Sequence, residues 1–170
     1  MTHLTKAALL LGTLALAACS TSADRFGTDV SGTAGGAGGI ASSGIGDPSS
    51  VGFFQQQVGD RVLFVVDTSD LTPAAQETLR GQAQFLLSNA GYTAIIEGHA
   101  DERGTREYNI ALGARRATAV QDFLVSQGVA PNRLRTVSYG KERPLEICSD
   151  EACYTQNRRA VTVLGAGLGS

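Results

Sequence analysis

The sequence predicts an α/β fold, a two-layer sandwich in which a small mixed sheet has its helices packed on one face. From residue 60 onward, short β-branched apolar runs alternate with two long helical patterns, as expected when helices cover a sheet. The last predicted strand follows no long helix, so we expect a mixed sheet rather than a wholly parallel one. The chain has 170 residues, which is enough for one domain once the leader described next is subtracted.

The N-terminus predicts secretion and a lipid anchor. After one early lysine, residues 7–18 are apolar. As a helix this run would rise about 18 Å, too short for a hydrocarbon core of about 30 Å, so we interpret residues 1–18 as a signal peptide. Leu16-Ala17-Ala18-Cys19 resembles a lipobox and predicts lipidation at Cys19, with an ordinary cleavage site beside a chance cysteine as the alternative. Ser20, in place of an aspartate, favours the outer membrane.

Residues 19–59 predict a flexible tether. They are rich in Gly, Ser, Thr and Ala, and such a segment buries too little apolar surface to offset the entropy of ordering it. A coil of this length has a root-mean-square reach of roughly 35 Å. A phosphate-binding glycine loop is the alternative, but it needs a preceding strand and a following helix that the pattern does not show. Phe53 and Phe54 are expected to dock on the domain or to begin it.

The domain is predicted over residues 60–165, with a short tail at 166–170. β-branched runs indicate strands, Pro preceded by Thr is typical of a helix start, and Asn or Gly after an apolar stripe is typical of a helix end. The expected elements are a strand at 61–66, a helix from Pro73 with Thr72 as N-cap that ends at 89–91, a strand at 92–97, a helix at 105–127 that ends before Gly128, and strands at 134–139 and 160–164.

Composition and motifs exclude several functional classes. The formal net charge of −2 argues against binding of nucleic acid. Only His99 of the two histidines lies beyond the signal peptide, so we expect no metal site and no cofactor. The sequence contains no nucleophile elbow, phosphate-binding loop or zinc-type Cys/His spacing. Asp67 and Asp101 are a pair of carboxylates, but no apolar surroundings that would raise one pKa are evident, so we expect no catalytic residues and no enzyme.

One polar run stands where α/β sheets usually place their sites. Residues 98–109 follow a predicted strand and lead into a helix. On that helix Asn109 and Arg116 share a face about 10 Å apart, with Leu112 between them. Arg116 suits a carboxylate and Asp101 suits an ammonium group, so together they predict a receptor for a zwitterion. Asn109 would add neutral donors and acceptors.

Other readings of these charges stay open. A purely structural salt bridge between Asp101 and Arg116 is as compatible with the spacing as a ligand site is. Asp67 follows the first predicted strand and is level with Asp101 if the two strands are parallel neighbours, which would make it a second anion in the same site. We interpret Asp70 as a turn or cap residue and His99 as a loop histidine whose hydrogen bonds are satisfied.

Several motifs, in order, resemble one family. They are EGHADERGT at 97–105, EYNIALG at 107–113, RRA at 115–117, VSYGKE at 137–142 and NRRAV at 157–161. Together they resemble the OmpA-like peptidoglycan-binding domain over roughly residues 61–164. The resemblance implies a non-catalytic domain that binds the diaminopimelate of the peptidoglycan stem. It implies that Asp101 and Arg116 recognise this ligand and that Asp67, Asn109 and Leu112 line the same pocket.

The resemblance has further implications and two departures. For lipid-anchored members it implies a partner, the periplasmic propeller protein TolB. Val66 stands where an aromatic residue is common in the family, and Arg106 stands where a proline is common. The first departure changes the contact that the family makes on the Val66 side of the pocket. The second is expected to loosen the loop before the helix.

Two cysteines remain beside Cys19. Cys148 and Cys153 are five residues apart in a loop, and an oxidising periplasm favours a disulfide between them over two free thiols. Taken together, the leader, the polar run and the resemblance predict a non-enzymatic lipoprotein of the outer membrane, facing the periplasm, that links the membrane to the cell wall. The alternatives are a module that mainly binds a protein such as TolB, and a wall-active hydrolase.

Overall fold

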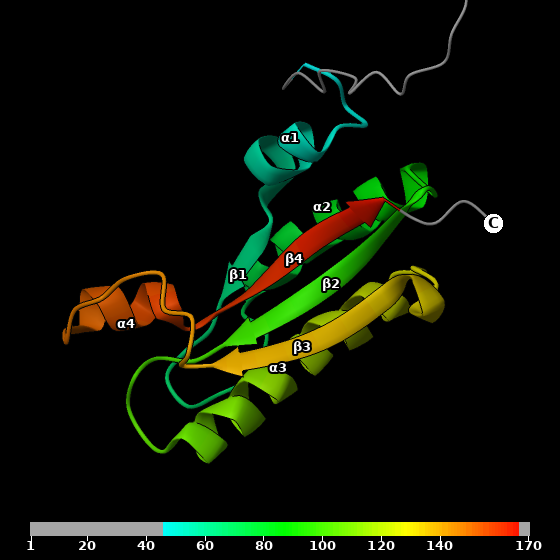
Figure 1. Cartoon of the computed structure of the whole chain (residues 1–170). Helices are drawn as coiled ribbons and strands as arrows, with labels where there is room; N and C mark the ends of the chain where they lie inside the picture. The colour runs from blue at the N-terminus through cyan, green and yellow to red at the C-terminus, as the bar shows by residue number, and fades with distance from the viewer. Residues whose placement is uncertain (1–45, 167–170) are drawn as a thin grey trace, which may run out of the picture. The chain divides into compact units, whose positions relative to one another are not determined.

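Figure 1 shows the computed structural model, which describes residues 46–166. The predicted signal peptide, Cys19, the tether up to residue 45 and the last four residues of the tail lie outside the described residues. The elements in chain order are α1 (Val51–Phe53), η1 (Phe54–Gly59), β1 (Arg61–Leu63), α2 (Pro73–Ser88), β2 (Tyr92–His99), α3 (Arg106–Ser126), η2 (Pro131–Arg133), β3 (Leu134–Gly140), α4 (Glu151–Asn157) and β4 (Arg159–Ala166). None of the helices in this part of the chain is long and apolar enough to span a membrane.

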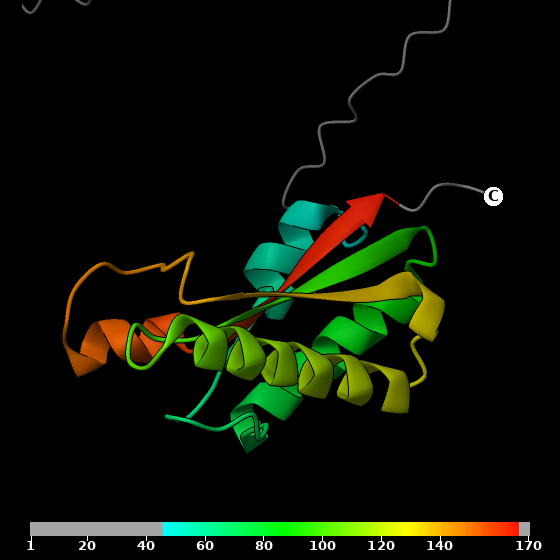
Figure 2. The same cartoon turned by 60° about the horizontal axis from the view of Figure 1, so that its bottom comes forward.

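The four strands form one mixed sheet in the order β1-β4-β2-β3. Strands β2 and β3 are parallel, whereas β4 runs antiparallel to both β1 and β2. Helices α2 and α3 cover the same face of the sheet (Figures 1 and 2). The opposite face leaves Leu63, Ile95 and Val163 exposed by 37, 43 and 41%. The predicted fold class, a two-layer sandwich with helices on one face, is confirmed.

The two long helices begin where their capping residues predict. The Thr72 hydroxyl accepts a hydrogen bond from the Ala75 backbone N–H, and Pro73 occupies the first turn of α2. The Thr105 hydroxyl caps α3 in the same way, by accepting from the Tyr108 N–H. After α3 the chain reverses at Gly128, whose φ of +99° is strained for any other residue. These local signals fix where each helix starts and stops.

A close approach of backbones sets the position of α3 on the sheet. A Cβ atom placed on Gly98 of β2 would overlap the carbonyl group of Gly113 on α3. The pair therefore lets the helix axis lie nearer the strand than side chains would permit. This contact lies one residue from the loop that carries Asp101, so it also sets the distance between that loop and α3.

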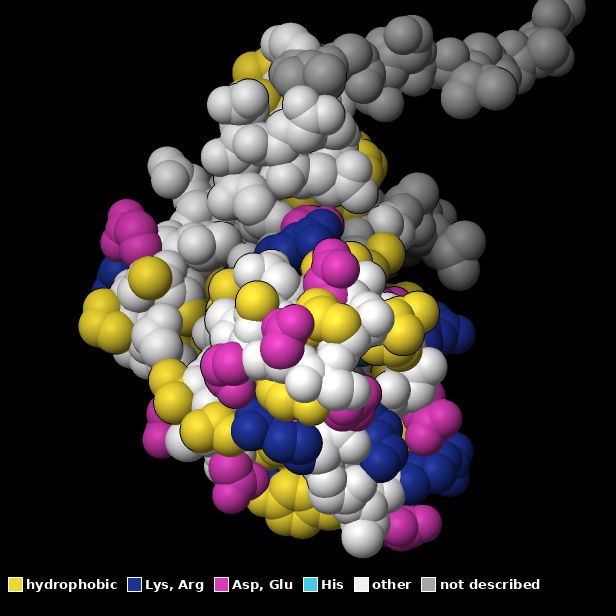
Figure 3. Space-filling model, turned by 90° about the vertical axis from the view of Figure 1, so that its left-hand side faces the viewer, with side chains coloured by type: hydrophobic (Ala, Val, Ile, Leu, Met, Phe, Trp, Pro, Cys, Tyr) yellow, Lys and Arg dark blue, Asp and Glu magenta, His cyan; other side chains and the backbone are white. Residues whose placement is uncertain are grey.

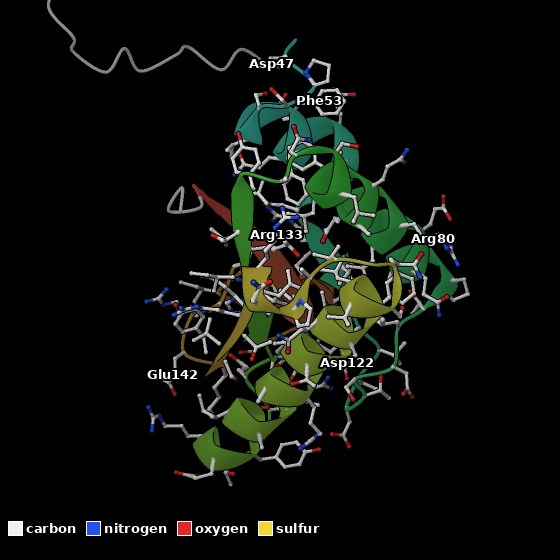
Figure 4. The ribbon with its side chains drawn as sticks, turned by 90° about the vertical axis from the view of Figure 1, so that its right-hand side faces the viewer. Asp47, Phe53, Arg80, Asp122, Arg133 and Glu142 are labelled. Carbon is white, nitrogen blue, oxygen red and sulfur yellow. A yellow bond between two sulfur atoms is a disulfide. The ribbon has the colours of Figure 1, made fainter. Side chains whose placement is uncertain are left out.

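The structure corrects the predicted start of the domain. Residues 51–59, predicted as tether, form α1 and η1. Phe54 is fully buried and its ring lies 5.0 Å from that of Phe85 on α2. Phe53, labelled in Figure 4, lines a groove beside the end of α2. Burial of this aromatic pair outweighs the weak helical preference of the segment, because fully burying a large apolar side chain contributes about 2 kcal/mol.

Two further features differ from what the sequence predicts. The predicted strand at 61–66 ends at Leu63, and Val65 and Val66 are exposed by 55 and 47% because the chain leaves the sheet there. Helix α4 was not predicted, since its seven residues carry no apolar stripe.

Candidate functional site

The five residues predicted to bind a ligand line a single pocket of about 210 Å³. The pocket lies at the end of the domain where β2 finishes and α3 begins. Figure 3 views the molecule from the α4 side and shows acidic and basic side chains interspersed with apolar ones. The walls come from the loop after β1 (Val66 and Asp67), the loop after β2 (Asp101, Arg103 and Gly104) and α3 (Tyr108, Asn109, Leu112 and Arg116).

Arg116 is enclosed in the pocket wall. Its side chain is fully buried, and its guanidinium lies over the Phe64 ring, 5.1 Å from the centroid. Its Nε donates to the Thr68 carbonyl at 2.8 Å and its Nη2 to the Val65 carbonyl at 3.1 Å. Its Nη1 donates to the His99 carbonyl at 2.8 Å. Three of the five guanidinium N–H groups therefore hold the loop after β1 and the end of β2 in place.

Arg116 nevertheless keeps its charge. Burial lowers the pKa of Arg116 to about 10; Asp101 opposes this shift and Arg158 adds to it. At neutral pH the guanidinium is protonated and contributes a fixed positive charge behind the pocket.

Asp101 pairs with arginines other than Arg116. Its Oδ2 accepts from Arg103 Nη2 at 2.7 Å and from Arg158 Nη1 at 3.2 Å, and its Oδ1 accepts from the Arg103 backbone N–H at 3.2 Å. Asp101 is only 7% exposed. Burial acts to raise the pKa of Asp101, but the hydrogen bonds from Arg103 and Arg158 outweigh it and hold the pKa below its ordinary 3.8. Asp101 is therefore ionised at neutral pH.

The predicted clamp is corrected on this point. Asp101 and Arg116 line one pocket, but Arg116 does not present a free bidentate fork, because backbone carbonyls engage it on three sides. The alternative, a structural salt bridge between the two residues, is also not what the described residues form. Sequence spacing places both side chains near the pocket but does not reveal that other groups are nearer to each.

Asp67 is the more accessible anion of the pocket. It is exposed, and its backbone has a φ of +57°, which is uncommon for a residue with a side chain. The Tyr108 hydroxyl on α3 donates a hydrogen bond to its carboxylate. The turn from Val65 to Thr68, whose two carbonyls Arg116 holds, therefore presents Asp67 at the pocket mouth.

Asn109 and Leu112 complete the floor of the pocket from α3. Asn109 is 1% exposed, and its Nδ2 donates to the Arg103 carbonyl at 2.8 Å, which ties α3 to the loop after β2. Leu112 is 5% exposed and contributes apolar surface. The pocket thus combines charges of both signs with one amide and one aliphatic side chain.

Three residues of the site were missed by sequence reasoning. Arg103 and Tyr108 belong to the polar run at 98–109, yet nothing in the run says which side chains face inward. Arg158 belongs to the NRRAV motif, whose presence marks the family without giving a role. Arg158 is 5% exposed, and besides Asp101 it contacts Glu151 at 2.6 Å and the Phe64 carbonyl at 3.2 Å.

Helix α4 braces the loop after β2. Glu102 accepts hydrogen bonds from the Ser149 hydroxyl at 2.8 Å and the Tyr154 hydroxyl at 2.9 Å. Lys141 donates to the carbonyls of Glu102 at 3.2 Å and Gly104 at 2.7 Å. The loop that carries Asp101 is therefore held from two sides by segments distant in sequence.

The predicted disulfide between Cys148 and Cys153 is confirmed. It closes the segment that leads into α4. The two sulfurs and a carboxylate oxygen of Asp150 lie within 4.8 Å of one another, but the sulfurs are bonded to each other and so are not thiolate ligands. That no metal binds stays a prediction.

His99 differs from the expected satisfied loop histidine. It is 2% exposed at the end of β2, and neither ring nitrogen has a hydrogen-bond partner among the described residues. Burial, then the positive charges of Arg159 and Arg143, lowers the pKa of His99 to about 4. The imidazole is therefore neutral at pH 7.

Comparisons with known proteins agree with the family suggested by the motifs. The chain matches the OmpA family over residues 63–158. It is 56% identical over 130 residues to the "Peptidoglycan-associated lipoprotein" of Mesorhizobium japonicum, covering 76% of this chain and 77% of that one. It is 53% identical over 161 residues to the protein of the same name from Rhizobium meliloti, covering 95% and 87%.

Solved structures give the same result for the fold. The crystal structure of the peptidoglycan-associated lipoprotein from Burkholderia pseudomallei has a TM-score of 0.65 at 38% identity and covers 70% of this chain and all of its own. The C-terminal domain of Helicobacter pylori MotB has a TM-score of 0.60 at 20% identity, covering 64% and 86%, which concerns the fold alone.

Proposed function

Because the chain belongs to the OmpA family, we propose that its domain binds peptidoglycan noncovalently through the diaminopimelate of the peptide stem. One observation supports this most: the five residues predicted from the sequence to bind the ligand come from three separate segments and line one small pocket. The relatives of the chain include proteins named for association with peptidoglycan.

The chemistry of the pocket suits the free end of diaminopimelate. That end carries an ammonium and a carboxylate on one carbon, so it needs a nearby anion and a nearby cation. Asp67 at the mouth and Asp101 deeper in the wall are the anions. Arg116 provides the positive potential behind them, Asn109 an amide and Leu112 a surface for the methylene chain.

We further propose that the protein is an outer-membrane lipoprotein with its domain in the periplasm. Residues 1–18 would direct export, and acyl chains on Cys19 would hold the protein on the membrane, since more than one chain gives stable anchoring. The segment after Cys19 would let the domain reach the wall. In this role the protein would act with TolB in the Tol–Pal system, in envelope integrity and cell division.

A wall-active hydrolase is less compatible with the electrostatics. A general acid that works near neutral pH needs a raised pKa, whereas Asp101 has a lowered one. Incubating the purified domain with isolated sacculi is expected to release no soluble muropeptides. Release that depends on Asp101 would replace the binding proposal with a catalytic one.

Co-sedimentation with purified sacculi tests the binding proposal. Asp67→Asn and Asp101→Asn keep the side-chain shape and remove the negative charge, so each is expected to weaken binding about tenfold or more, equal to about 1.4 kcal/mol. Asp122→Asn is the matched control, because Asp122, labelled in Figure 4, is exposed on α3 and does not line the pocket. Circular dichroism checks that all three variants are folded.

The same variants separate this function from the protein-interaction alternative. If Asp67→Asn and Asp101→Asn bind sacculi as tightly as wild type, the pocket does not bind the wall. Retained wild-type binding to TolB in these variants would then favour a module whose main ligand is a protein.

A further inference from the structure

The carboxylate of Asp101 is already in contact with two cations of its own chain. Arg103 and Arg158 both donate to Oδ2, at 2.7 and 3.2 Å. A carboxylate offers about four lone-pair positions, and the Arg103 backbone N–H takes one on Oδ1. An incoming ammonium group therefore meets a carboxylate whose inner oxygen is fully engaged.

The two arginines are held very differently. The Arg158 side chain is 6% exposed and is fixed by Glu151, Thr155 and the Phe64 carbonyl as well as by Asp101. The Arg103 side chain is 45% exposed, and its shortest contact is the one to Asp101. Arg158 is thus part of the framework, whereas Arg103 lies in the pocket wall with its side chain partly in solvent.

In the same position the Arg103 guanidinium also faces two side chains of α4. Its guanidinium lies 4.6 Å from the centre of the Tyr154 ring, and its Nη2 lies 3.8 Å from a carboxylate oxygen of Glu151. Glu151 and Tyr154 are held in place through Arg158 and Glu102. A rotation of the side chain from Asp101 towards Glu151 would keep an acidic partner and the cation–π contact with Tyr154.

We propose that Arg103 is an internal competitor that occupies the ammonium position on Asp101 in the empty domain and moves to Glu151 and Tyr154 when the ligand binds. This inference rests on the proposed function and adds a selection step to it. A ligand with a free ammonium group replaces the charge that Arg103 removes. A ligand without one leaves Asp101 paired with Arg103 and gains nothing from the pocket anion.

Calorimetric titration with two synthetic probes tests this. The first is the stem tripeptide that ends in diaminopimelate, and the second is the same peptide with the side-chain amine acetylated. In Arg103→Ala the free-amine peptide is expected to bind about three- to tenfold more tightly, because the competitor is gone. The acetylated peptide is expected to change less than twofold, so the selectivity for the free amine rises.

Two further variants make the test specific. Arg106→Ala removes the same charge three residues away, where Arg106 pairs with exposed Glu142 at 3.0 Å, and is expected to leave both affinities within twofold of wild type. Arg103→Lys keeps a cation next to Asp101 and is expected to lie between wild type and Arg103→Ala. Thermal unfolding checks the fold of each variant.

The outcomes are distinct. Weaker binding of the free-amine peptide by Arg103→Ala would show that Arg103 contacts the ligand directly, and unchanged binding would show that Arg103 does not compete; either overturns the inference while leaving the proposed function intact. Failure of wild type to bind the free-amine peptide would overturn the proposed function itself and the competitor with it.

Discussion

Replacing Arg116 with lysine is expected to destabilise the domain by about 3 kcal/mol. The arginine donates to three carbonyls that lie in different directions, those of Val65, Thr68 and His99. A lysine ammonium is a single point, and we expect it to reach one of them. Two of the three acceptors then lose a charged hydrogen bond, at about 1.5 kcal/mol each.

Urea unfolding followed by circular dichroism measures this change. The midpoint should fall while the slope stays the same, since the surface exposed on unfolding is unchanged. Arg115→Lys is the control, because Arg115 is exposed and its guanidinium lies 6.0 Å from the centre of the Tyr108 ring. Its effect should stay within about 0.5 kcal/mol.

The same substitution is expected to weaken sacculus binding at temperatures where the variant is fully folded. Arg116 holds the carbonyls on both sides of Asp67, so its loss frees the turn that presents this carboxylate. If Arg116→Lys is as stable as wild type, the three hydrogen bonds from Arg116 to backbone carbonyls do not stabilise the domain as argued. A destabilised variant that still binds sacculi normally would show that the hydrogen bonds of Arg116 do not position Asp67.

Three other predictions follow from the same geometry. Gly98→Ala should cost about 3 kcal/mol, because its Cβ overlaps the Gly113 carbonyl, and a wild-type melting temperature would contradict this. Reducing the Cys148–Cys153 disulfide should lower the free energy of unfolding by about 2 kcal/mol in urea, while a double serine variant should not respond to reductant. The free energy of unfolding should also decrease as the pH is lowered from 7. The pKa of His99 is 6.5 in the unfolded chain and about 4 in the folded one, so protonation favours the unfolded chain and lowers the free energy of unfolding by about 2 kcal/mol at pH 5. His99→Gln should flatten that profile, and an equally steep profile in the variant would assign the effect to other groups.

Much of the fold could be read from short stretches of sequence. Thr72 and Thr105 mark helix starts because a cap depends only on residues three positions away. The parts that failed depend on distant contacts. Phe54 docks on the domain as its place in an aromatic pair predicts, but the helices at residues 51–59 depend on its contact with Phe85 on α2, which no local pattern around residue 54 specifies.

The candidate site divides in the same way. The motifs and the position of Asp67 after the first predicted strand identified Asp67, Asp101, Asn109, Leu112 and Arg116, and the structure brings them to one pocket. They did not show which charges are neutralised inside the protein. Arg103, which we propose as a competitor, lies two residues from Asp101 and was visible in the run, yet its direction was not.

The chain by itself determined the boundaries of the two long helices α2 and α3, the cysteine pair and the polar run after β2, since these follow from spacing within a few residues. Only the tertiary structure decided the electrostatic partners. Arg158 reaches Asp101 across 57 residues, and Arg116 reaches the Thr68 carbonyl across 48. A guanidinium pairs with whichever acceptor packing brings within about 3 Å of it, and that distance exists only after the sheet and its helices have closed.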